Sequence, residues 1–166
     1  MKKPCLVVEK VLASGFGVGF FPWGSGTMGA LLALGIWMFL SLYLGNAELL
    51  LATLLLSFVG TGVGTWAANR LQPYWGNDPN CIVIDEMVGM WIALMGVPMG
   101  EADLYINRYY ILAAFLLFRL FDIFKPLGIR ALDRRVGGFW VMADDILAGV
   151  YSLIIIFACR LLFFCH

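Results

Sequence analysis

Long apolar runs separated by short polar breaks predict helices that associate with a membrane. Residues 11–47 carry no charge, but glycines and Pro22 interrupt the first half of this run, so a helix is expected at about residues 28–44. Residues 49–68 form a second apolar run with about the 20 residues that cross a hydrocarbon layer. Three further segments carry ionisable residues near their ends: 82–97, 104–121 and 145–164. The pattern predicts an all-α bundle with about five membrane-associated helices.

Composition supports the membrane interpretation. Of the 166 residues, 62% are hydrophobic and only 13% are charged, against about 25% charged residues in soluble domains. A soluble domain of this length cannot bury so much apolar surface. Eleven acidic and eleven basic residues give no net charge, which argues against a nucleic-acid partner. We expect one membrane-embedded domain over residues 1–166, with residues 1–27 forming a cytoplasmic or interfacial segment that ends in a broken, Gly-rich loop.

The distribution of basic residues predicts the orientation of the chain. With the N-terminus inside, the outer loops 45–48 and 98–103 contain acids but no Lys or Arg. Only Arg108 and Arg160 lie toward the outside. The inner side would hold Lys2, Lys3, Lys10, Arg70, Arg119, Lys125, Arg130, Arg134 and Arg135. Because basic loops stay on the cytoplasmic side, the asymmetry predicts a multi-pass protein whose inner helix ends face the cytoplasm.

This orientation brings five carboxylates to one side of the membrane. Asp85 and Glu86 open the third segment, Asp122 closes the fourth, and Asp144 and Asp145 open the fifth. Carboxylates beside lipid are costly and need a partner or a function. The only histidine is the last residue and the cysteines have no zinc-type spacing, so hard oxygen ligands for Mg²⁺ are the metal chemistry that remains. The alternative is helix capping by Asp144 and Asp145.

Basic residues near these acids allow two interpretations. Arg119, Asp122 and Lys125 stand at i, i+3 and i+6, so they share one helix face and can pair with one another. The same face, together with Arg130, can instead bind a phosphate. Attraction to anionic lipid is a further role open to Lys125 and Arg130.

The glycine-rich loop and the known nucleophile motifs limit the reactions that the chain is expected to catalyse. The loop at residues 24–29 (GSGTMG) precedes a helix whose N-terminus can bind an anion, but it lacks a Walker lysine. Gly60, Gly64, Gly89 and Gly149 are expected to allow close helix packing. No cysteine is followed by Arg six positions later, and no Asp-x-Asp pair occurs. Metal- and carboxylate-assisted chemistry remains, with water or an Asp as the nucleophile.

Four blocks of the sequence stand out together. They are residues 26–29 (GTMG), 84–91 (IDEMVGMW), 119–126 (RLFDIFKP) with Ile129, Arg130, Asp133 and Arg134, and 144–149 (DDILAG). In this order and with suitable spacing, from about residue 15 to about residue 155, the chain resembles the phosphatidylglycerophosphatase A family. It has Ser25 where the family usually has Pro, and Ala30 where Ser is common.

The resemblance implies a Mg²⁺-dependent lipid phosphatase of the bacterial inner membrane. It would convert phosphatidylglycerophosphate to phosphatidylglycerol and phosphate, with a metal-activated water as the preferred nucleophile. The metal ligands would come from Asp85, Glu86, Asp122, Asp144 and Asp145, of which Asp85, Glu86, Asp122 and Asp145 are the catalytic candidates. Substrate binding would fall to Gly26, Thr27, Arg119, Lys125 and Arg130.

Two other functions fit an acid-rich membrane protein. A CDP-alcohol phosphotransferase would need an Asp-Gly-x-x-Ala-Arg block, which the chain lacks. A divalent-cation or proton transporter would use acids near the middle of the membrane and often inverted repeats. The predicted acids lie instead at one interface, and no repeat is evident.

Overall fold

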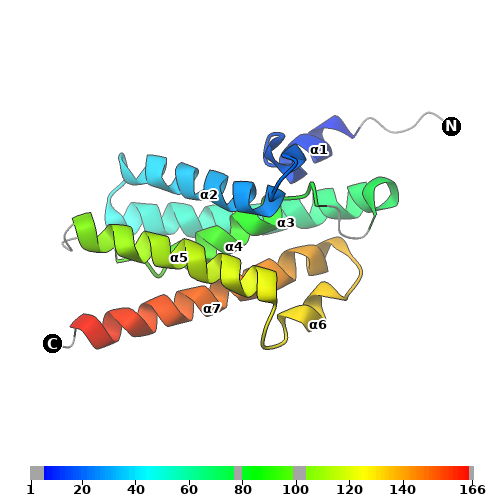
Figure 1. The fold of residues 1–166 in the computed structure, drawn as a ribbon. Coiled ribbons are helices and arrows are strands. Elements are labelled where there is room, and N and C mark those ends of the chain that lie inside the picture. Colours follow the sequence, from blue (N-terminus) through cyan, green and yellow to red (C-terminus); the bar gives the residue numbers. More distant parts are fainter. Residues whose placement is uncertain (1–5, 77–79, 99–103, 165–166) are drawn as a thin grey trace.

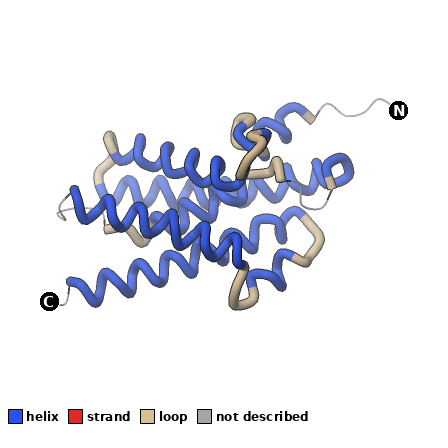
Figure 2. The backbone as a smooth tube through the Cα atoms, viewed as in Figure 1, coloured by secondary structure: helices blue, strands red, loops and turns tan. Residues whose placement is uncertain are grey.

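The computed structural model describes residues 6–76, 80–98 and 104–164, and these residues form helices and connecting loops without strands. The all-α prediction is therefore confirmed for the described part of the chain (Figures 1 and 2). The elements are α1 (Val7–Ala13), the 3₁₀ helix η1 (Val18–Phe20), α2 (Ser25–Ser41), α3 (Asn46–Trp75), α4 (Ile84–Leu94), α5 (Leu104–Phe124), α6 (Ile129–Asp133) and α7 (Gly138–Phe164).

Helix α4 forms the centre of the bundle and packs against α2, α3, α5 and α7 (Figure 1). Glycines allow this close packing. A Cβ atom on Gly89 would lie 2.6 Å from the carbonyl oxygen of Asp145, and one on Gly60 would lie 2.8 Å from Val88 Cγ2. With 11 residues, α4 is about 16 Å long, which is too short to cross about 30 Å of hydrocarbon.

Among the described residues, two helices are long and apolar enough to cross a membrane: α3, and α7 over Gly138–Leu162. Their outward side chains are apolar, as in Leu51 and Phe58 on α3 and Ile154 on α7, which are all exposed. Helix α2 is apolar but shorter, and α4 is mostly buried within the bundle. The prediction of about five membrane helices is therefore not confirmed.

Helices α2, α3 and α7 begin earlier than the sequence pattern predicted, at Ser25, Asn46 and Gly138. Helix α2 begins at Ser25, so Gly26 and Thr27 lie in its first turn rather than in a loop. Helix α7 begins at Gly138, so Asp144 and Asp145 lie well inside the helix and the capping interpretation is wrong. The backbone N–H of Gly138 donates a hydrogen bond to Asn69 Oδ1 at 2.8 Å, which satisfies one of the free donors at this helix start.

Helix α1 packs onto the bundle and supports the start of α4. The backbone N–H of Val83 donates to the carbonyl of Ala13 at 2.8 Å. The buried Glu9 forms an ion pair with Arg70 on α3 at 3.4 Å. These contacts join α1 to α3 and to Val83, which directly precedes α4. Asp85 and Glu86 lie in the first turn of that helix.

Candidate active site

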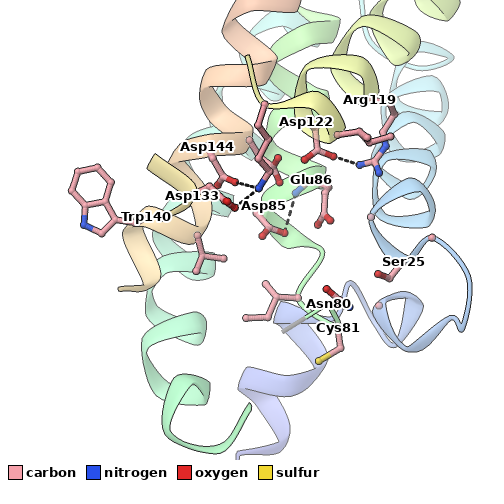
Figure 3. A pocket seen from close by; sticks show the side chains of 18 of the residues that line it. Ser25, Asn80, Cys81, Asp85, Glu86, Arg119, Asp122, Asp133, Trp140 and Asp144 are labelled. Atoms are coloured by element: carbon pink, nitrogen blue, oxygen red, sulfur yellow. Dashed lines mark hydrogen bonds and ion pairs between the residues drawn. The ribbon is translucent and has the colours of Figure 1, made fainter. Parts of the chain in front are cut away.

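A polar pocket of 910 Å³ opens where helix ends meet at one end of the bundle. The starts of α2 and α4, the end of α5, the segment after α6 and the first turns of α7 contribute its walls. Figure 3 shows Asp85, Glu86, Asp122 and Asp144 converging on it from three helices. The charged lining residues are Asp85, Glu86, Asp122, Asp133, Asp144, Asp145, Arg119, Lys125, Arg134 and Arg135.

Three of these carboxylates form a tight cluster, which we call the acidic trio: Asp85, Glu86 and Asp145. One oxygen atom of each lies within 4.8 Å of the others. Asp85 is 6% exposed and Asp145 is 4% exposed. No basic side chain in the described part of the chain forms an ion pair with the trio.

Oxygen atoms of the trio also lack hydrogen-bond donors. Oε2 of Glu86 and Oδ1 of Asp145 are buried without a partner. One oxygen of the trio is satisfied by the chain, because the backbone N–H of Glu86 donates to Asp85 Oδ1 at 3.0 Å. Buried charges without a partner are costly, so the trio fits a divalent cation that takes oxygen ligands.

The other three carboxylates, which we call the paired carboxylates, are Asp122, Asp133 and Asp144. Asp122 pairs with Arg119 one helical turn earlier on α5. Asp133 and Asp144 both pair with the ammonium group of Lys125, the latter at 2.7 Å. Burial alone would lower the pKa of Lys125, but these two ion pairs outweigh it and hold its pKa above the usual range. Lys125 is therefore a permanent cation in the pocket wall.

The chain leaves α5 in an uncommon backbone conformation that places Lys125. Lys125 has φ of +46° and Leu127 has φ of +52°, both in the left-handed region that side chains disfavour. Gly128 follows with φ of +93° and precedes α6. This reversal brings Asp133 on α6 to the same ammonium group as Asp144 on α7, so Lys125 links α6 to α7.

Gly26 lies directly against the charged groups. A Cβ atom at this position would lie 3.0 Å from Cδ of Glu86 and 3.1 Å from Nη1 of Arg119. The first turn of α2 can approach the acidic trio this closely only because residue 26 has no side chain.

The structure gathers most, but not all, of the residues predicted from the sequence. Eight line the pocket: Asp85, Glu86, Asp122, Asp144, Asp145, Gly26, Arg119 and Lys125. Thr27 and Arg130 do not. Arg130 is exposed and donates to the carbonyl of Phe124 at 3.4 Å. For these two residues the geometry does not support the predicted contact with substrate.

Several lining residues were missed as site candidates. They are Ser25, Asn80, Asp133, Arg134, Arg135 and Trp140. The available signal was the polar run at residues 133–135, which falls between glycines 128 and 137. Helix α6 has five residues, which is too short for a helical period to be recognised in the sequence.

Comparison of the sequence with known proteins matches it to one family. The model of the phosphatidylglycerophosphatase A family matches residues 11–160, which include α2 to α6 and nearly all of α7. The chain belongs to the phosphatidylglycerophosphatase A family. It is therefore a phosphatase enzyme, which decides against the transporter and the CDP-alcohol phosphotransferase.

Curated relatives cover almost the whole chain. A protein of Bacteroides thetaiotaomicron with the provisional name phosphatidylinositol-3-phosphatase is 48% identical over 160 residues, 96% of this chain and 98% of the relative. Phosphatidylglycerophosphatase A of Escherichia coli K12 is 37% identical over 86% of this chain and 77% of its own length. The Haemophilus influenzae protein of the same name is 37% identical over 89% and 86%. No solved structure matches the chain at a significant level.

Proposed function

We propose that this chain forms a single lipid phosphatase domain that hydrolyses phosphatidylglycerophosphate to phosphatidylglycerol and phosphate, with Mg²⁺ as its cofactor. Membership of the family and the names of the two enzymes at 37% identity support this substrate. The observation that carries the proposal is the acidic trio, whose oxygens lie within 4.8 Å of one another in a pocket that is also lined by basic side chains.

The charge of the pocket supports a divalent cation. Six carboxylates and four basic side chains line it, so the pocket alone carries a negative formal charge. Such a pocket repels a phosphomonoester, because like charges a few ångströms apart cost about 4 kcal/mol per pair at an effective dielectric constant of 20. Asp85, Glu86 and Asp145 would hold Mg²⁺ through their oxygens. Bound there, the ion would offset the carboxylate charge and polarise a phosphoryl oxygen.

Residues around the trio can bind and orient the phosphate. The guanidinium of Arg119 is held by Asp122, and its buried Nε atom has no hydrogen-bond partner. It therefore retains a donor for a phosphate oxygen. The first turn of α2 adds backbone N–H groups at a helix N-terminus, beside Ser25 and Gly26 in the pocket wall.

The proposed reaction is attack of water on the phosphorus atom. A P–O bond forms to the water oxygen while the P–O bond to the glycerol breaks. The water loses a proton and the leaving alkoxide gains one, so the products are an alcohol and inorganic phosphate. An Asp nucleophile is the alternative, and the configuration at phosphorus of an isotopically chiral phosphate product distinguishes the two, because one displacement by water inverts it and two displacements through an aspartyl phosphate retain it.

We place the enzyme in the bacterial inner membrane as a multi-pass protein whose pocket faces the cytoplasm. The predicted excess of basic residues at this end supports that orientation. A test uses single cysteines at exposed positions in a variant without native cysteines. Leu127→Cys, beside the pocket, should react with an impermeant maleimide only after the cells are opened, whereas Tyr43→Cys should react in intact cells. The reverse pattern contradicts the orientation.

A second substrate is favoured by one observation. The relative at 48% identity carries a name that refers to phosphatidylinositol 3-phosphate. Both lipids present a phosphomonoester on a headgroup that is joined to the glycerol by a phosphodiester. Phosphate release from each lipid by the purified enzyme, with Mg²⁺ and with EDTA, decides between them. We expect a higher kcat/KM for phosphatidylglycerophosphate and no release in EDTA; activity confined to the inositol lipid would overturn the substrate assignment.

A further inference from the structure

The pocket is larger than a phosphomonoester requires, and its two sides differ. A water molecule takes about 30 Å³ of liquid volume, so an ion and a five-atom phosphate group fill a minor part of 910 Å³. In Figure 3, Ser25 marks the α2 side of the pocket and Trp140 marks the opposite side. The acidic trio occupies the region where α4 and α7 meet. The α6–α7 side remains for another part of the ligand.

Two basic residues on that side have no carboxylate partner among the described residues. Arg119 and Lys125 are ion-paired, whereas Arg134 and Arg135 form no ion pair within the described part of the chain. The guanidinium of Arg135 lies over the ring of Trp140, with Cζ 4.2 Å from the ring centroid. A stacked guanidinium is held in place while the N–H groups at its edge stay available to an anion.

The paired carboxylates fix the segment that carries these arginines. Asp133 directly precedes Arg134 and is tied to Lys125, which is tied in turn to Asp144 on α7 at 2.7 Å. The backbone N–H of Arg135 donates to the carbonyl of Leu132 at 2.9 Å. Arg134 and Arg135 therefore occupy a defined place in the pocket wall although their side chains are exposed.

We propose that Arg134 and Arg135 form a subsite for the phosphodiester group of the lipid substrate. The inference rests on the proposed function and extends it. A phosphorylated glycerophospholipid headgroup carries a monoester, which reacts, and a diester, which joins it to the lipid. Planar guanidinium groups suit the diester because they form paired hydrogen bonds to phosphate oxygens. The subsite would favour such lipids over phosphatidate and soluble phosphomonoesters, which lack the diester.

The test compares the Arg134→Ala/Arg135→Ala double variant with wild type in uncharged detergent micelles. Because the double variant loses charge-assisted hydrogen bonds to the diester, KM for phosphatidylglycerophosphate should rise by about tenfold or more while kcat changes little. The Kd of acyl-labelled phosphatidylglycerol, which has only the diester, should rise by a similar factor. Inhibition by inorganic phosphate should be unchanged, because that anion needs only the reacting end of the pocket.

A matched control removes a charge outside the pocket. Lys10 is an exposed cation on α1 that lies near Trp75, and Lys10→Ala should leave KM and the phosphatidylglycerol Kd unchanged. Equal effects of Lys10→Ala and the double variant would mean general attraction to anionic lipid and would overturn the subsite. A drop in kcat with unchanged KM and Kd would also overturn it.

Failure of the proposed function gives a different result. If the wild type does not hydrolyse phosphatidylglycerophosphate, the substrate assignment fails. The Kd of phosphatidylglycerol then still reports on the subsite, and an unchanged Kd in the double variant overturns it. Arg135→Lys separates the effect of charge from that of geometry, because it keeps the charge and loses the planar group. We expect it to bind phosphatidylglycerol more tightly than the double variant but more weakly than wild type.

Discussion

The acidic trio and the paired carboxylates line one pocket but differ in what neutralises them. Asp122, Asp133 and Asp144 each contact Arg119 or Lys125. Asp85, Glu86 and Asp145 contact no basic side chain in the described residues, and two of their oxygens are buried without a donor. The paired carboxylates are neutralised by basic side chains of the protein, although Oδ1 of Asp144 is also buried without a donor. No basic side chain of the described residues neutralises the trio in this way. We interpret the paired carboxylates as residues that shape the pocket and the trio as the proposed cation ligands.

Asp144 and Asp145 show how closely the two sets approach. They are neighbours on α7, and successive helical residues point about 100° apart. Asp144 therefore faces Lys125 while Asp145 faces Asp85 and Glu86. Adjacent identical residues make separate contacts because the helix turns between them.

The largest effects are expected from neutralising the trio. Asp85→Asn, Glu86→Gln and Asp145→Asn should each lower kcat by on the order of 10²–10³-fold, as loss of a group that stabilises transition-state charge does. The same variants should unfold at an equal or higher temperature in EDTA, since each removes an uncompensated charge. Phosphate release measures kcat, and thermal unfolding with Mg²⁺ and with EDTA measures the unfolding temperature. A large loss of stability in EDTA would contradict the unpaired state of the trio.

An intermediate effect is expected for Asp144→Asn, which should lower the stability of the protein and leave its Mg²⁺ requirement unchanged. This change removes one of the two ion pairs of Lys125, and hydrogen bonds to charged groups contribute about 1.5–3 kcal/mol. The variant should unfold more easily with or without Mg²⁺, and the Mg²⁺ concentration for half-maximal activity should stay close to that of wild type. If that concentration rises as it does for Asp145→Asn, the two neighbours do not have separate roles.

The smallest predicted effect concerns the fit of α2 against the trio. Gly26→Ala forces Glu86 or Arg119 to move, since the new Cβ would lie 3.0 Å from Glu86 Cδ and 3.1 Å from Arg119 Nη1. We expect activity to fall by about tenfold, equivalent to about 1.4 kcal/mol, with little change in stability. Gly35→Ala on the same helix is the control, because nothing lies within 4 Å of its added Cβ. Equal activities of the two variants would refute close contact between Gly26 and the trio.

The sequence predicted which carboxylates lie together better than it predicted the bounds of the helices around them. Asp85, Glu86 and Asp122 lie at helix ends, so they can be recognised in the sequence as acids at the ends of apolar runs. The uneven distribution of basic residues then predicted that these helix ends lie on the same side of the membrane. The pattern misplaced the start of α7 because Asp144 and Asp145 interrupt the apolar run, although residues 138–143 (GFWVMA) carry no charge. The helix start at Gly138 is held by Asn69 from a distant part of the chain. Such long-range contacts leave no local pattern.

The pairing of charges could not be predicted from spacing alone. The i, i+3 relation correctly indicated the ion pair between Arg119 and Asp122. It also suggested that Arg130 belongs to the site, but Arg130 and Thr27 lie outside the pocket lining. Lys125 reaches Asp133 and Asp144 only through the left-handed turn after α5. The outer loop prediction at residues 98–103 falls largely outside the described residues.

Direct titration of the purified protein with a divalent cation tests the central contrast most directly. Electron paramagnetic resonance measures the concentration of free Mn²⁺ when the protein in detergent, without substrate, is titrated with this ion. Mg²⁺ is then added as a competitor for the same site. We expect a saturable site in the wild type and in Asp133→Asn, displaced by Mg²⁺, and its loss in Asp145→Asn. Equal binding by all three proteins, or no binding by the wild type, would contradict the assignment of the acidic trio as the cation site.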